Sequence, residues 1–207
     1  MDRVYITSLL KEIQDIMCSN RDYLIKLDSV VGDGDLGLTM SDGFVAAYKA
    51  VADSEEPDAG KLLYNAGKAM STAVPSTMGT LMASGLMQAG KVLKGKMQLE
   101  PGDIADLFQA YLEGVENRGK AKVGEKTFLD GLDPAVKALK TALASGNTLA
   151  EAATRAREAA EEGFKNTTTM VAVHGRAATR GEASRTLEDP GAAVAMLIMI
   201  AFEASVQ

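Results

Sequence analysis

Apolar residues recur at helical spacing along almost the whole chain, and this periodicity limits the possible folds more than any other feature. In the first such segment, a helix that we expect to run to about residue 27, the apolar face consists of Ile6, Leu9, Leu10, Ile13, Ile16 and Met17. Only residues 30–31 and 170–173 look extended, and neither segment is followed by a partner strand. The chain is therefore predicted to be all-helical.

Capping residues and the same spacing predict seven further helices. Thr148 and Glu151 have the spacing of a capping box, and an Asp-Pro pair suits the start of a helix at both Asp133 and Asp189. The expected helices cover residues 6–27, 39–52, 59–72 and 77–93, and four more begin after Asp103, at Asp133, near Thr148 and at Asp189. Eight amphipathic helices need a common core, so we expect residues 1–207 to form a single domain, a barrel or bundle of eight antiparallel helices.

Composition narrows the environment and the partners. A net charge of -6 gives no general attraction to nucleic acid or to anionic membranes. The most apolar stretch, residues 190–202, is too short to span a bilayer, and the N-terminus has no signal-peptide pattern. Cys18 stands alone in an apolar helical pattern, so it is interpreted as a core thiol. These features predict a cytoplasmic chain without a nucleic-acid or membrane partner.

Three segments break the helical pattern. Residues 28–37 are acidic, residues 116–132 are basic for this chain, and residues 165–188 carry Arg176 together with two further arginines. Long loops in a compact domain are usually functional or disordered. One acidic loop and two basic loops together suit a polyphosphate bound through a metal ion.

The acidic segment contains three aspartates within eight residues of one another: Asp28, Asp33 and Asp35. The spacing of Asp33 and Asp35 puts both carboxylates on one side of an extended stretch, and Asp28 can fold back to meet them. Crowded carboxylates repel one another unless a cation neutralises them, and magnesium prefers such oxygen ligands together with substrate phosphates. The free N–H groups of the following helix favour phosphate. The sequence therefore predicts a magnesium site.

The segment admits two other interpretations. Gly32, Gly34 and Gly37 match the G-x-G-x-x-G fingerprint of dinucleotide-binding folds, but Asp33 and Asp35 would face the pyrophosphate directly, and the alternating strands of a parallel sheet are missing. A dinucleotide-dependent enzyme is therefore the weakest option. The segment could instead be a solvated acidic turn, although three aspartates and three glycines between apolar flanks argue against this.

The order of the motifs resembles a known family. The chain is similar to the nucleotide-binding L subunit of dihydroxyacetone kinases, whose aspartates chelate two magnesium ions around ATP or ADP. The resemblance covers the whole chain and rests on five landmarks: residues 27–37, the loop 75–79 before the fourth helix, residues 118–127, residues 175–184 and residues 189–192.

The resemblance implies a barrel of eight antiparallel helices with the nucleotide at one end. Asp28, Asp33 and Asp35 would be the magnesium ligands, and these carboxylates with Arg176 would be the catalytic groups. The nucleotide would be bound by Leu36, Gly37, Leu38, Thr39, Ser76, Thr77, Met78, Gly119, Phe128, Arg176, Asp189, Pro190 and Gly191. The family usually has histidine at the position of Leu36 and asparagine at that of Thr39. Lys120 and Lys126 are interpreted as solvated charges, and His174 as structural or solvent-facing.

The implied function is phosphoryl transfer as a kinase subunit. Phosphate would pass from magnesium-bound ATP, or from ADP recharged in place, to a small ketose or related sugar held by a partner subunit. The expected partners are that sugar-binding kinase subunit and a phosphocarrier subunit, and the sequence leaves a homodimer open. The alternative from another class is a nucleotide-sensing regulatory module that binds a protein such as a transcription factor.

Overall fold

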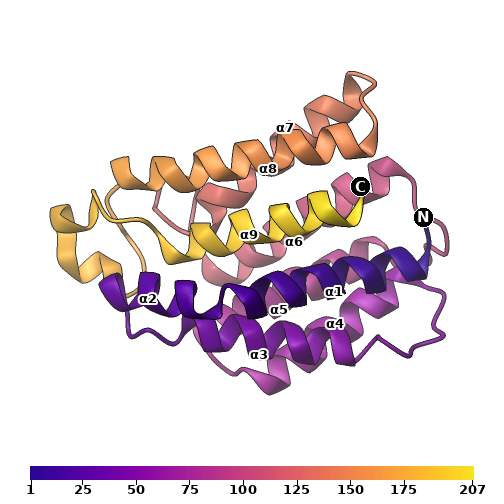
Figure 1. Cartoon of the computed structure of the whole chain (residues 1–207), viewed down its shortest axis with the longest axis horizontal. Helices are drawn as coiled ribbons and strands as arrows, with labels where there is room; N and C mark the ends of the chain where they lie inside the picture. The colour runs from indigo at the N-terminus through magenta and orange to yellow at the C-terminus, as the bar shows by residue number, and fades with distance from the viewer.

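The computed structural model describes residues 1–207, and every regular element in it is a helix (Figure 1). Two short 3-10 helices, η1 and η2, interrupt the connection between α8 and α9, which comprises residues 167–189 and is called here the α8–α9 connection. The elements in chain order are α1 (Arg3–Ser19), α2 (Arg21–Val31), α3 (Leu36–Lys49), α4 (Ala59–Ala73), α5 (Thr77–Val92), α6 (Pro101–Gly119), α7 (Phe128–Ala144), α8 (Leu149–Asn166), η1 (Thr167–Thr169), η2 (Arg176–Ser184) and α9 (Pro190–Ser205).

The helices close into a ring around one apolar core. From α3 onward each α-helix packs against the next, and α9 packs against α1, which in turn packs against α3. Chain direction alternates from one helix to its neighbour, and both termini lie at the same end of the molecule (Figure 1). Since α2 continues the course of α1, the ring has eight members, which confirms the predicted all-α antiparallel architecture.

The alternating direction decides where the loops lie. The connections α2–α3, α4–α5, α6–α7 and α8–α9 all fall at the end opposite the termini (Figure 1). The apolar helix faces are buried in the core, whereas the polar and glycine-containing loops remain available at this end. The five motif regions of the sequence therefore converge, because each lies in or beside one of these four connections.

Several helix boundaries differ from the sequence predictions. The first predicted helix is broken at Asn20, whose side-chain amide donates to the Ile16 carbonyl at 2.9 Å and so competes with the backbone. The helix expected from Asp133 begins at Phe128, because Thr127 and Asp130 form a capping box and Pro134 is accommodated inside α7. Residues 30–31, expected to be extended, form the last turn of α2.

Two further expectations concern exposure and loop structure. Cys18 is exposed, so its interpretation as a core thiol is wrong: it lies on α1 just beyond the buried stripe that ends at Met17. The third non-helical segment is partly helical, since α8 continues to Asn166 and η2 follows within the α8–α9 connection. No helix in the structure combines the length and apolar character required to cross a membrane.

Candidate nucleotide and metal site

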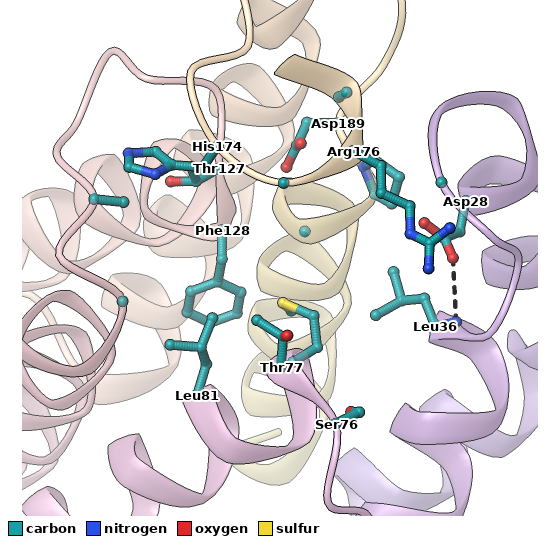
Figure 2. Close-up of a pocket in the computed structure, with 18 of the residues that line it drawn as sticks. Asp28, Leu36, Ser76, Thr77, Leu81, Thr127, Phe128, His174, Arg176 and Asp189 are labelled. Carbon is teal, nitrogen blue, oxygen red and sulfur yellow. Dashed lines mark hydrogen bonds between the residues drawn. The ribbon is translucent and has the colours of Figure 1, made fainter. Parts of the chain in front are cut away.

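A cavity of about 750 Å³ opens at the end of the barrel where the four connections meet (Figure 2). Each connection supplies part of its lining. The predicted residues that line it are Asp28, Asp33, Asp35, Leu36, Ser76, Thr77, Met78, Gly119, Phe128, Arg176, Asp189, Pro190 and Gly191. The fold thus brings together groups from most of the length of the chain, from Asp28 to Gly191.

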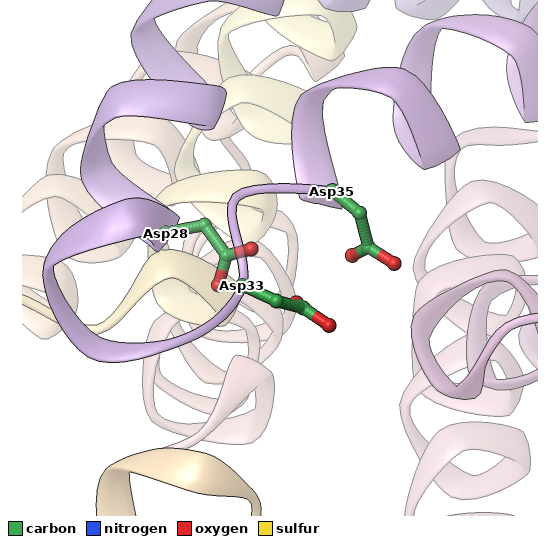
Figure 3. Close-up of side chains that lie close together, drawn as sticks. All are labelled: Asp28, Asp33 and Asp35. Carbon is green, nitrogen blue, oxygen red and sulfur yellow. The ribbon is translucent and has the colours of Figure 1, made fainter.

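The three aspartates form an acidic cluster on one wall. A carboxylate oxygen from each lies within 4.8 Å of one from both others, and all three side chains turn toward a common space (Figure 3). Asp28 lies in the last turn of α2 and accepts a hydrogen bond from the Leu36 N–H at 3.3 Å. Gly34, with φ of 75°, permits the tight turn between the two helices.

The electrostatics of the acidic cluster favour a bound cation. Partial desolvation raises the pKa of the Asp35 carboxyl, and the neighbouring charges of Asp33 and Asp28 raise it further. Three carboxylates at this spacing repel one another, and each offers the hard oxygen that Mg²⁺ prefers. The residues therefore fit a magnesium ion both in geometry and in charge.

Arg176 reaches across the cavity to the acidic cluster. It begins η2, directly after Gly175 at φ of 65°, and its Nη2 lies 2.6 Å from Asp33 Oδ2. The side chains of Arg176 and Asp33 are 69% and 41% exposed, so this ion pair adds little to the stability of the fold. A guanidinium at this place can instead meet phosphate oxygens beside the cluster.

The N-terminus of α5 forms the floor of the cavity. Ser76 caps the helix, because its hydroxyl accepts from the Gly79 N–H at 3.0 Å. Thr77 and Met78 are the first two residues of α5, so their N–H groups have no partner within the helix. Both residues line the cavity, and a helix N-terminus in this position favours an anionic group.

The opposite wall is apolar and would suit a flat base. Phe128 is buried at the start of α7, where its ring lies 6.1 Å from that of Tyr111. Leu81 and Gly119 lie beside Phe128 in the lining, and a side chain at Gly119 would meet Leu81 at 3.1 Å. The lack of a side chain at Gly119 thus keeps this wall open.

Asp189 marks the point where α9 enters the cavity wall. Its carboxylate caps α9 by accepting from the Ala192 N–H at 2.7 Å. Burial raises the pKa of Asp189 to about 7, although the Ala192 N–H and the Lys126 ammonium act in the opposite direction. Gly191 packs closely on the first residue of α7, where an added Cβ would lie 3.0 Å from Phe128 N.

Three predicted nucleotide contacts lie outside this cavity. Gly37 is buried against α2, and an added Cβ there would overlap the Arg21 carbonyl oxygen. Leu38 and Thr39 line a separate hollow of about 270 Å³, and Thr39 accepts a 3.4 Å hydrogen bond from Ser76. The reason is that α3 begins at Leu36 rather than at Thr39, so its first turn faces α2 and the α4–α5 connection.

Two residues that line the cavity, Lys126 and His174, were not among the predicted site residues. The interpretation of Lys126 as a solvated charge is wrong: Lys126 is only 2% exposed, and burial lowers the pKa of its ammonium. His174 lines the cavity, and its Nε2 lies 2.6 Å from Glu125 Oε2. No pattern in the sequence identifies Lys126 as buried, because the carbonyls that accept its hydrogen bonds belong to residues 41 to 61 positions away.

Comparison with known proteins agrees with this architecture. The DAK2 domain family matches residues 30–204. The chain is 31% identical over 199 residues to the PEP-dependent dihydroxyacetone kinase, ADP-binding subunit DhaL, of Escherichia coli, covering 96% of this chain and 95% of that subunit. It is 34% identical over 200 residues to L-erythrulose 1-kinase of Mycolicibacterium smegmatis, covering 94% of this chain but 34% of that enzyme.

The fold itself also matches a solved structure. The dihydroxyacetone kinase of C. freundii in its native form superposes with a TM-score of 0.74 at 21% identity, covering 97% of this chain and 34% of that one. The chain thus spans about a third of these larger kinases and nearly all of the bacterial subunit. Together with the motif order, these matches establish that the chain belongs to the DAK2-domain family.

Proposed function

We propose that this chain is the nucleotide-binding, phosphoryl-transferring subunit of a dihydroxyacetone-kinase-like enzyme. The observation that carries the proposal is one cavity that combines the acidic cluster, the N-terminus of α5, an arginine and an apolar wall. Each part suits one portion of a magnesium nucleotide: carboxylates for the metal, N–H groups and guanidinium for phosphate, and Phe128 for the base. The 31% identical E. coli relative is named as an ADP-binding subunit, which agrees with this assignment.

Asp28, Asp33 and Asp35 would hold two magnesium ions. When bound, the ions offset negative charge on the phosphate oxygens. The chain's own groups would do the rest by positioning. The free N–H groups of Thr77 and Met78 would orient the phosphates, and Arg176 would neutralise charge on the side facing solvent. Gly119 and Phe128 would fix the base, while Asp189 to Gly191 would lie near the ribose.

The sugar would be held by a partner subunit docked over the cavity. Relatives from E. coli and Lactococcus lactis are named PEP-dependent and PTS-dependent, respectively. Those names favour ADP that stays bound and is recharged by a phosphocarrier subunit, over ATP that exchanges at each turnover. The acceptor would be dihydroxyacetone or a related small ketose.

Titration calorimetry with ADP, ATP and AMP, each with and without magnesium, tests the nucleotide assignment. We expect ADP and ATP to bind tightly only with magnesium, and AMP to bind weakly because it lacks the phosphates that bridge to the metal. Binding that is indifferent to magnesium would contradict the proposal. Magnesium-dependent binding without sugar phosphorylation by any combination of subunits would favour the regulatory alternative.

A further inference from the structure

Lys126 is a buried lysine whose ammonium lies in a cage of backbone oxygens. Its three N–H groups are shared among four carbonyl oxygens: those of Thr167 and Met170 lie 2.6 and 3.3 Å from Nζ, and those of Arg185 and Leu187 lie 3.1 and 2.5 Å from it. These acceptors come from both ends of the α8–α9 connection. The ammonium therefore acts as a non-covalent cross-link that closes the base of this connection.

Lys126 combines two energetically costly features. Its φ is 61°, in the left-handed region that residues with a Cβ rarely adopt. Burial of an ammonium is also costly unless it is fully hydrogen-bonded. Such strain and burial are maintained where the surrounding structure depends on them.

The part of the connection between the two anchored ends carries Arg176. Three further contacts outside the base hold this part: Ser184 accepts from the Ala172 N–H at 2.9 Å, the Val173 N–H donates to the Glu125 carbonyl at 3.3 Å, and His174 Nε2 lies 2.6 Å from Glu125 Oε2. Most residues from 176 to 183 are exposed. The place of Arg176 over Asp33 thus depends on two supports: the base of the connection, which Lys126 closes, and the contacts of Val173 and His174 with Glu125.

We propose that Lys126 is a positioning residue of the nucleotide site, which holds the α8–α9 connection so that Arg176 lies over the acidic cluster. Lys126 reaches the phosphates only through Arg176 and is not itself a catalytic residue. The expected effect of Lys126 on the affinity for ADP rests on the proposed function. The expected effect of Lys126 on the order of the α8–α9 connection does not.

The test compares Lys126→Met, which keeps the length of the side chain without its charge, with Lys122→Met. Lys122 is an exposed lysine in the same loop whose ammonium makes no hydrogen bond within the chain. Hydrogen exchange across residues 167–189 without nucleotide should be roughly tenfold faster in Lys126→Met and unchanged in Lys122→Met. The affinity for ADP with magnesium should fall roughly 10- to 100-fold in Lys126→Met alone. Helical content should match the wild type in both variants.

Chemical rescue separates the ammonium from the rest of the side chain. In Lys126→Ala, added propylammonium replaces the three missing methylenes and the charge, and it should restore slow exchange and ADP affinity. Propanol at the same concentration should restore neither property. Rescue by propanol would show that filled volume, rather than the charged cross-link, matters and would overturn the proposal.

The remaining outcomes are equally decisive. Wild-type exchange and ADP affinity in Lys126→Met would overturn the proposal, and so would faster exchange with unchanged affinity. Global unfolding of Lys126→Met would assign Lys126 to stability of the whole fold instead of positioning. If the wild-type chain itself fails to bind ADP with magnesium, the proposed function is wrong, while the exchange data still decide whether Lys126 holds the connection.

Discussion

The charges of Asp33 and Asp35 in the acidic cluster contribute little to the stability of the fold. Asp33 is exposed and pairs with an exposed arginine, and Asp35 is likewise on the surface of the cavity. Exposed ion pairs are worth about 0–1 kcal/mol. A substitution at either aspartate should therefore separate ligand binding from stability.

Asp33→Asn should remove magnesium-dependent ADP binding and leave the fold intact. Loss of one carboxylate should weaken binding by more than roughly 100-fold, the upper end for groups that only support a metal ligand. Calorimetry with ADP and magnesium measures the affinity, and circular dichroism checks the helical content. Asp22→Asn is the matched control, because Asp22 is an exposed carboxylate on the helix that also carries Asp28. Wild-type affinity in Asp33→Asn would contradict the magnesium assignment.

Asp189 gives the chain a dependence of stability on pH. Its pKa is about 7 in the folded chain against an ordinary 3.8, so the folded state binds this proton more tightly. The protonated Asp189 carboxyl therefore stabilises the folded state most below about pH 4. This contribution to the free energy of unfolding is lost as the pH rises toward 7. Asn at position 189 keeps the acceptor for the Ala192 N–H but does not titrate.

Asp189→Asn should thus gain stability relative to the wild type as pH rises. Between pH 5 and pH 7 the difference in the free energy of unfolding should move by about 2 kcal/mol in favour of the variant, since one pH unit is worth about 1.4 kcal/mol for one proton. Urea denaturation of both chains at each pH measures it, and other titrating groups cancel in the difference. A constant difference would show that Asp189 is charged throughout this range.

At the scale of elements, the junction between α2 and α3 sets the geometry of the acidic cluster. The two helices are in contact at Gly37, where no side chain fits against the Arg21 carbonyl. Asp28 of α2 also binds the first N–H of α3. The separation of these helices and the spacing of the carboxylates are therefore coupled.

Gly37→Ala should destabilise the fold although alanine is the better helix former. The new Cβ would force α2 and α3 apart, and overpacking of this kind costs about 1–3 kcal/mol. Gly102→Ala is the control, because Gly102 lies in α6 with open space around it, so it should be neutral or slightly stabilising. Urea denaturation measures both. Equal stability of the two variants would contradict the close contact at Gly37.

At the scale of the whole molecule, the cavity contains groups for one reactant. Its polar lining comprises carboxylates, helix N–H groups, hydroxyls and basic side chains that suit a magnesium nucleotide. The rest of the chain contributes apolar helix faces to a single core. A kinase must bring both reactants within bonding reach, so the sugar would lie on a separate subunit.

The purified chain with ATP and magnesium should therefore phosphorylate no sugar by itself. Activity should appear when a sugar-binding kinase subunit is added, and Asp35→Asn should abolish it without preventing the two subunits from docking. Sugar phosphate formation and size-exclusion chromatography measure the two properties. Robust turnover by the chain alone that vanishes in Asp35→Asn would place the sugar site here and refute the prediction.

Local sequence determined the all-helical class, two of the three expected caps and the order of the site residues, although it misplaced the break at Asn20 and the start of α7. Thr148 and Asp189 cap the helices that they were expected to cap, because capping depends on side chains within about three residues of the helix start. An even number of short-looped antiparallel helices also places alternate loops at one end. The convergence of the motifs could therefore be predicted from the sequence.

Only the tertiary structure decided which loop residues face the cavity and which support it. Gly37 to Thr39 turned away because the first turn of α3 packs against α2 and the α4–α5 connection. Lys126 is a buried cross-link because the four carbonyls that surround it belong to the α8–α9 connection, which is distant from Lys126 in the sequence. Spacing along a chain reports neighbours within one helix or turn, whereas burial and hydrogen-bond partners of a loop residue depend on segments that only folding brings together.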